Sequence, residues 1–296
     1  MTAGRRTALL RLYGPISLMV LVWSASFIFA KMALADIPGL LMACVRTVVA
    51  AALILPLHWW NERRAPAPAT LKQLLFLFGL GFGGIVLNQL LFVIGLSRTS
   101  VAHAAFMIAL APILVLLLAA VRGQERLTPQ KVAGLAVAAG GVCLLQLLPG
   151  ASREASLSGD AIILVATVAL AIYTVAGREI AHRHGAIRIN TYAYAGGALL
   201  LAPVLYWQAR GFNFGAVRPR AWVGLLYMAV FSSIVAHVIY YWALSHLPAS
   251  RVASFSYLQP LVATVLAVPA LGEPVTPPVV AGGALVLAGV WLTERG

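Results

Sequence analysis

The feature that most constrains this chain is a succession of apolar segments separated only by short polar breaks. Segments of about 20 mostly apolar residues, the length a helix needs to cross a bilayer, follow one another from Pro15 to Trp291. They lie near residues 15–35, 39–58, 73–96, 100–121, 130–149, 159–180, 190–209, 221–246, 249–271 and 278–294. With 61% hydrophobic and 10% charged residues, no stretch is left for a sizeable soluble domain. We therefore predict an all-α integral membrane protein with ten transmembrane helices.

The sequence also repeats itself at an offset of 148 residues, half its length. The matching pairs are Pro112 with Pro260, Glu125 with Glu273, Thr128 with Thr276, Gly134 with Gly282, and Gly141 with Gly289. Such matches at one constant offset are not expected by chance in an apolar chain. They predict two five-helix repeats, residues 1–148 and 149–296. Because five is odd, the second repeat is inverted in the membrane, and a central cavity is expected where the repeats meet.

Positive charges indicate how the chain is oriented. With ten spans, the side that holds both termini collects 14 of the 21 Lys and Arg residues, the other side has six, and Arg46 lies within the second span. This bias predicts a multi-pass protein of the bacterial inner membrane with both termini in the cytoplasm. The first apolar segment has no small-residue cleavage site after it, so it is expected to remain as a helix. The net charge of +13 lies in loops, which argues against a nucleic-acid partner.

Certain polar, aromatic and proline residues mark the apolar segments. They are Trp23, Ser24 and Ser26 in the first span, Arg46 in the second, Asn88 in the third, and the paired proline-to-glutamate segments 112–125 and 260–273. With ten spans and two repeats, this pattern resembles the EamA-type branch of the drug/metabolite transporter superfamily over essentially the whole chain. The resemblance implies an exporter or exchanger of small metabolites, in a family that includes amino-acid exporters, with a cavity lined by spans one, three and four and their repeat partners. It implies no particular substrate, because the family transports amino acids, sugars, nucleotides and drugs.

The third and eighth spans hold a first group of candidate substrate-binding residues. His237, Tyr240 and Tyr241 share one helical face, and the offset pairs His237 with Gln89 and Tyr240 with Phe92. The inverted halves are therefore expected to present these groups to each other across the cavity, where aromatic faces suit apolar or zwitterionic ligands. The alternative is that the tyrosines anchor the protein at the membrane interface and pack against their neighbours.

Other spans supply further candidates for contact with the substrate. They are Trp23, Ser26, Asn88, His103, Met107, Tyr173, Tyr257 and Gln259. Asn88 and Gln89 lie deep in the third span, where they either contact substrate or hold helices together. Pro112 and Pro260 each free a backbone carbonyl, which either binds a substrate amine or only permits a bend.

A second set of residues is expected to have structural roles. It comprises Arg46, Pro112, Glu125, Pro260 and Glu273. An unpaired Arg46 is costly in a bilayer, so it either holds a substrate carboxylate, extends to the surface or bonds to helix ends. Glu125 and Glu273 are expected to accept hydrogen bonds from the amides at the start of the next helix. Thr128, which precedes a proline, is predicted to cap the fifth helix.

The sequence favours secondary or facilitative transport over other functions. It has no phosphate-binding G-x-x-x-x-G-K-[ST] motif, so ATP is not expected to drive transport. No Asp or Glu lies mid-span, and only His103 and His237 titrate near neutrality there, which favours facilitated diffusion or exchange over strict proton antiport. We expect no cofactor, metal or catalytic residue, and a monomer whose partners are a small-molecule substrate and the lipid bilayer.

Three alternatives remain to be weighed against this interpretation. One is a proton-coupled exporter of drugs or other metabolites. The second is a membrane transferase, for which residues 182–184, His-Arg-His, are the only candidate cluster, but no carboxylate pair or metal-ligand spacing accompanies them. The third is an ion channel, for which no filter-like repeat or charged ring is present. Export of small metabolites, most notably neutral or aromatic amino acids, by alternating access is the function we predict.

Overall fold

The computed structural model describes residues 3–64, 70–99, 104, 107–146, 156–259, 261–262, 266 and 277–295. Helix is the regular structure throughout these ranges, and each of the ten predicted spans contains a described helix. Five helical segments are long and apolar enough to cross a membrane by length and composition, and two shorter apolar helices accompany them in the described part of the chain. Four residues singled out from the sequence, His103, Pro260, Glu273 and Thr276, lie outside the described residues.

The helices follow the predicted segments in order. They are α1 (Ala3–Leu34), α2 (Gly39–Arg64), α3 (Leu71–Gly81), α4 (Leu87–Leu96), α6 (Ala111–Val121), α7 (Pro129–Gln146), α8 (Leu157–His184), α9 (Ala186–Arg210), α10 (Pro219–Tyr227), α11 (Ala236–Leu244), α12 (Ala249–Ser254) and α14 (Pro277–Arg295). Two π-helical segments, η1 (Phe82–Val86) and η3 (Met228–Val235), join α3 to α4 and α10 to α11. Two 3-10 turns, η2 (Phe214–Ala216) and η4 (Phe255–Tyr257), complete the described elements.

Local sequence signals explain where several helices begin. Thr70 and Gln73 form a reciprocal capping box at the start of α3. The cap predicted at Thr128 is confirmed, because its hydroxyl accepts a hydrogen bond of 3.2 Å from the amide of Lys131. The fourth apolar segment differs from a continuous helix: a turn at residues 109–110 interrupts it, and α6 begins at Ala111. Pro112 lies in the first turn of α6, where a missing amide breaks no helical hydrogen bond.

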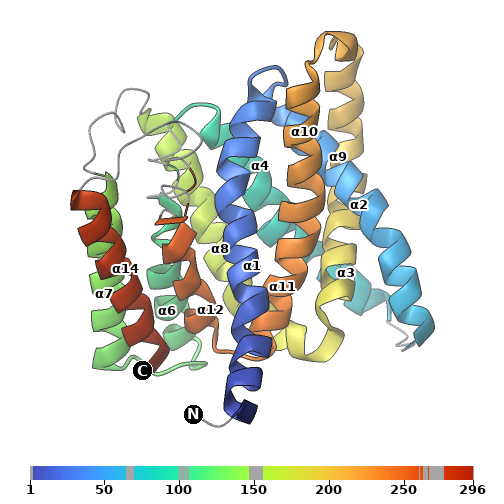
Figure 1. The fold of residues 1–296 in the computed structure, drawn as a ribbon. Helices are drawn as coiled ribbons and strands as arrows, with labels where there is room; N and C mark the ends of the chain where they lie inside the picture. Colours follow the sequence, from blue (N-terminus) through green and yellow to red (C-terminus); the bar gives the residue numbers. More distant parts are fainter. Residues whose placement is uncertain are drawn as a thin grey trace.

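The two halves of the chain pack as related units. The second helices of the halves, α2 and α9, lie against each other, and so do the fifth, α7 and α14. The first helix of each half packs on the third span of the other, α1 on α10 and α11, and α8 on α4. Figure 1 shows α1 starting at the end where both termini lie, whereas α8, its counterpart, finishes at that end. This reciprocal pairing is what an inverted duplication produces.

The helices α7 and α14 approach each other most closely through glycine. A Cβ atom on Gly141 would lie 2.7 Å from the carbonyl oxygen of Gly282, and one on Gly289 would lie 2.4 Å from the amide nitrogen of Ala138. Both nearest atoms belong to the backbone, so no side-chain movement could make room. Small residues allow this close packing, which is typical of helix pairs in membranes.

The outward surface of the bundle is apolar, as lipid contact requires. Leu199, Leu200, Val165 and Ile172 project from α8 and α9 and are 50–73% exposed. Exposed apolar area on this scale would drive a water-soluble monomer to aggregate, whereas it matches hydrocarbon.

Glu125 lies in the link between α6 and α7 and joins the two halves. Its carboxylate accepts hydrogen bonds from the amide of Ser250, at 3.0 Å, and from the Ser250 hydroxyl, and it pairs with Lys131 at 2.9 Å. We predicted that Glu125 accepts hydrogen bonds from the amides at the start of α7, and this prediction is wrong about which helix donates them. The amide that donates to the carboxylate belongs to the first turn of α12, in the other half, whereas α7 contributes only the side chain of Lys131.

Ion pairs also connect the halves at both ends of the bundle. Arg188 of α9 pairs with Glu62 of α2 at 2.5 Å. At the opposite end, Arg218 pairs with Asp36, which lies between α1 and α2, at 2.6 Å. Hydrogen bonds from Arg218 hold the pKa of the Asp36 carboxyl below its usual range, so this pair stays charged at neutral pH.

Candidate functional site: a cavity between the two halves

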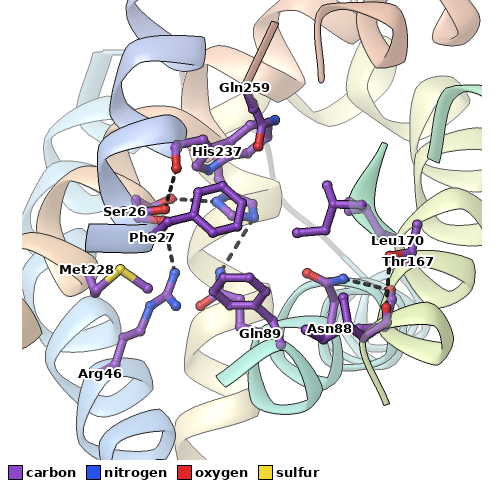
Figure 2. Close-up of a pocket in the computed structure, with 16 residues that line it drawn as sticks. Ser26, Phe27, Arg46, Asn88, Gln89, Thr167, Leu170, Met228, His237 and Gln259 are labelled. Carbon is purple, nitrogen blue, oxygen red and sulfur yellow. Dashed lines mark hydrogen bonds between the residues drawn. The ribbon is translucent and has the colours of Figure 1, made fainter. Parts of the chain in front are cut away.

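A cavity lies where the two halves meet, in the middle of the bundle (Figure 2). Its volume is about 80 Å³, several times the space that one water molecule needs. It is lined by Trp23, Ser26, Phe27, Arg46, Asn88, Gln89, Phe92, Ile108, Ile163, Ala166, Thr167, Leu170, Met228, Ser232, His237 and Gln259. The lining draws on α1, α2, α4, α8, η3 and α11, so residues far apart in sequence form one chamber.

Seven of the predicted substrate-binding residues line this cavity together. They are Trp23, Ser26, Asn88, Gln89, Phe92, His237 and Gln259. Tyr240 lies behind the wall, with its ring 5.4 Å from that of Trp23. Tyr173 and Tyr241 are fully buried against each other, at 5.8 Å between ring centroids, outside the lining. Tyr257 is also buried away from the lining, and Met107 packs against an apolar cluster.

The two π-helical segments occupy equivalent places in the two halves, just before Gln89 and His237. A π turn leaves carbonyls without their usual helical partners, and such turns recur at functional sites. In η3, the carbonyl of Ser232 lies 2.8 Å from Nδ1 of His237, and that of Ser233 accepts a hydrogen bond of 3.2 Å from Asn190. Side chains thus satisfy the wide turn and set the direction of the His237 ring.

Gln89 and His237, which the offset pairs with each other, meet at the centre. Their Nε2 atoms are 3.5 Å apart. Because Nδ1 of His237 lies on a carbonyl, its proton is assigned there and Nε2 is left to accept from the Gln89 amide. The same amide donates to the hydroxyl of Tyr194, and Asn88 donates to the carbonyl of Ala166 at 2.7 Å. This layer of uncharged polar groups crosses the interface between the halves.

Aromatic rings form the apolar walls of the cavity. The ring of Trp23 lies 5.4 Å from that of His237 in an edge-on arrangement. The rings of Phe27 and Phe92 meet edge to face at 5.7 Å. Such pairs are mutually attractive and hold the walls in defined positions.

Arg46 enters the cavity from α2, although the sequence suggested a structural role. Its Nε donates to the hydroxyl of Ser233 at 2.8 Å, and one terminal nitrogen, Nη2, donates to that of Ser232 at 3.1 Å. The other terminal nitrogen, Nη1, is buried and has no hydrogen-bond partner in the described part of the chain. Figure 2 shows the guanidinium turned toward the middle of the ring of lining residues.

Sequence reasoning did not single out half of the lining. The missed residues are Phe27, Ile108, Ile163, Ala166, Thr167, Leu170, Met228 and Ser232. The pair Ser232-Ser233 gave a usable signal, since two adjacent hydroxyls in an apolar span must face protein or water. The apolar residues gave no signal, because the sequence does not distinguish an apolar side chain that faces lipid from one that lines a cavity.

Comparison with protein families decides the class of this molecule. The profile of the EamA-like transporter family matches twice, at residues 14–147 and 157–295. The chain belongs to this family. It is therefore a ten-helix membrane transporter built from two repeats, and the predicted fold class is confirmed. Membership of this family means that the protein transports a small-molecule substrate and lies in contact with membrane lipid.

Individual relatives of this EamA-like chain agree with the family match. Two uncharacterized transporters of Archaeoglobus fulgidus are 29% and 28% identical over 282 and 280 residues, covering 94–95% of this chain and 95–97% of theirs. A probable terminal-alkyne amino-acid exporter of Streptantibioticus cattleyicolor is 29% identical over 280 residues, covering 94% of this chain and 91% of its own. A protein of known crystal structure has the same fold, with a TM-score of 0.77, 19% identity and 96% coverage of both chains.

Proposed function

We propose that this EamA-like transporter exports small neutral or aromatic amino acids across the bacterial inner membrane by alternating access. The observation that carries the proposal is the meeting of Gln89 and His237 at the centre of the bundle. It places uncharged polar groups of both halves beside aromatic walls, in a chamber that a relative rocking of the halves would open to either side. Solutes with a polar end and an apolar side chain match such a lining.

The amino-acid substrate class has support from one relative. The Streptantibioticus protein, whose similarity extends over nearly the whole of both chains, is described as a probable amino-acid exporter. The description applies to the Streptantibioticus protein. Together with the polar layer at Gln89, it favours amino acids over lipophilic drugs as substrates of the present chain.

Transport by facilitated diffusion or exchange fits the lining better than proton antiport. No Asp or Glu lines the cavity among the described residues, and Nε2 of His237, the nitrogen that would take up a proton, faces the Gln89 amide that donates toward it. A carrier of protons through a membrane ordinarily depends on titratable groups of this kind.

Flux through purified protein in proteoliposomes tests the function directly. We expect uptake of labelled leucine or phenylalanine above that of empty liposomes, with no change when the pH gradient is collapsed. A stoichiometric proton flux would overturn the facilitative mechanism, and turnover of a lipid substrate without amino-acid flux would indicate an enzyme.

Trp23 offers a site-specific prediction for the same assay. Trp23→Ala removes an aromatic wall worth about 1–2 kcal/mol to a bound ring or cation, so uptake of phenylalanine at low concentration should fall about tenfold. Leu199→Ala, on the lipid-facing surface, is the matched control and should transport as the unchanged protein does. Equal flux in both variants would place the site elsewhere.

The proposed orientation has its own test. Both termini lie at one end of the bundle (Figure 1), and the loops of that end carry most of the positive charge. A reporter that is active only in the cytoplasm should therefore be active when fused to either terminus. Activity of a periplasm-specific reporter at either terminus would reverse the assignment.

A further inference from the structure

We infer that Arg46 is the receptor for a carboxylate of the transported solute, bound through the unpartnered Nη1 of its guanidinium. The inference rests on the proposed function, because it names the chemical group by which that same cavity recognises its solute. It assigns to this chain a preference for apolar monocarboxylates, whether or not they carry an amine.

The position of Arg46 is unusual for a charged residue. It lies within α2, in a segment that crosses the membrane, and only 2% of its surface is exposed. Charged residues at such depth are rare and mark the paths of substrates and ions. Arg46 does not reach the membrane surface, as a long basic side chain near a helix end would, but lies on the cavity.

The neighbours of Arg46 hold its guanidinium without neutralising it. Nε and Nη2 donate to the hydroxyls of Ser233 and Ser232, which are both buried in η3. Neither hydroxyl carries a charge, and no carboxylate pairs with Arg46 in the described part of the chain. The positive charge therefore lacks a counter-charge among the described residues, a costly state in a medium of low dielectric constant.

An anion in the cavity would supply both the counter-charge and the hydrogen-bond acceptor that Arg46 lacks. It would accept the hydrogen bond of Nη1, for which the described residues offer no acceptor, and would supply the missing negative charge. A guanidinium presents its donors in a plane that matches a carboxylate. Because two of its nitrogens are already anchored to η3, the binding of a carboxylate would order little that is not already ordered.

The surroundings of Arg46 indicate what else the solute must have. Phe27, Met228 and Phe92 line the same cavity, so the remainder of the solute is apolar. No acidic side chain lines the cavity among the described residues, so a solute ammonium group has only uncharged partners such as Gln89 and Gln259. The carboxylate is thus the group recognised by charge, and the amine is dispensable.

A series of solutes that share one side chain tests this in the unmodified protein. The probes are leucine, 4-methyl-2-oxopentanoate, leucine methyl ester and 3-methylbutan-1-amine, each as a competitor of labelled leucine uptake in proteoliposomes. The two carboxylates should compete at concentrations about tenfold to hundredfold lower than the ester and the amine, the ratio expected for one charged hydrogen bond. Sodium chloride, added at the same concentrations as the competitors, controls for general anion binding.

Substitution of Arg46 provides the second arm. R46Q should abolish the advantage of the acids over the ester, and R46K should keep part of it, because the charge remains while the planar donors are lost. R210Q is the matched control, since it removes one positive charge at the exposed end of α9, away from the cavity. If R46Q fails to fold, the solute series with the unmodified protein still decides.

The outcomes separate the inference from the function on which it rests. Equal competition by leucine, its ester and the amine overturns the role of Arg46 while amino-acid transport stands. Inhibition by chloride as strong as that by the acids would make Arg46 a general anion contact and also overturn the inference. Absence of leucine uptake overturns the proposed function, and the inference with it.

Discussion

Glu125→Ala should lower the free energy of unfolding by about 3 kcal/mol, the usual loss when one member of a buried, hydrogen-bonded charge pair is removed. The side chains of Glu125 and Lys131 are 4% and 9% exposed, so the ammonium of Lys131 would be left without its partner in a poorly hydrated place. The amide of Ser250 would also lose its acceptor at the start of α12. Denaturant unfolding in detergent micelles measures the change.

Glu125→Gln is the matched variant, because its amide oxygen still accepts from Ser250 while the charge is gone. It should lie between the unchanged protein and Glu125→Ala. Stabilities within about 0.5 kcal/mol of the unchanged protein for both variants, the range of ordinary surface changes, would contradict the role of Glu125 in joining the halves.

Measuring stability as the pH is lowered should detect the same contact, because protonation of the Glu125 carboxyl weakens it. Burial raises the pKa of the Glu125 carboxyl, but hydrogen bonds from Ser250 and Lys131 outweigh it, and the pKa lies below the ordinary 4.5. A lowered pKa means that the contribution is complete above pH 4.5 and is lost as the pH falls through the lower folded-state value. Glu125→Gln should lose less stability than the unchanged protein as the pH falls below 4.5. An equal loss in the two proteins would contradict the role of the Glu125 carboxylate.

The second large effect is expected at two adjacent glycines of α7. Gly141→Ala should destabilise the protein by about 1–3 kcal/mol, the cost of overpacking a tight interface, since its methyl group would lie 2.7 Å from the backbone of α14. Gly140→Ala should instead be neutral or stabilising by up to about 1 kcal/mol, the helix propensity of alanine over glycine, because nothing lies within 4 Å of its added Cβ.

The opposite signs make the pair its own control. Both changes add one methyl group to the same helix, so they have the same effect on insertion into the membrane. Thermal unfolding in detergent, followed by helicity, is the measurement. Equal shifts for the two variants would show that α7 and α14 are not packed as closely as the structure has them.

Much of the architecture could be predicted from the sequence because membrane helices leave a coarse signal. Apolar segments of spanning length located the helices, and the constant offset of 148 residues located the duplication. The same offset paired Gln89 with His237, and their contact follows directly from an inverted repeat, in which equivalent residues meet near the symmetry axis. The boundary between the repeats at residue 148 remains a prediction.

Finer features were beyond reach for identifiable reasons. The π turns η1 and η3 depend on which side chains can satisfy displaced carbonyls, as Asn190 does for Ser233, and such partners come from other helices. The partner of Glu125 depends on how the links fold back over the bundle. The free nitrogen of Arg46 becomes visible only once Ser232 and Ser233 are seen to occupy the other two.

The lining of the cavity is unequal in the two halves, although the framework is repeated. At the offset of 148, Arg46 corresponds to Tyr194, and Trp23 to Ala171. In the proposed cycle a solute meets different neighbours when it arrives from each face of the membrane, so the half-saturation concentrations at the two faces differ. A passive carrier cannot move an equilibrium, and its ratio of Vmax to KM is therefore equal in both directions. Faster flow one way at saturation would then reflect this inequality rather than a pump.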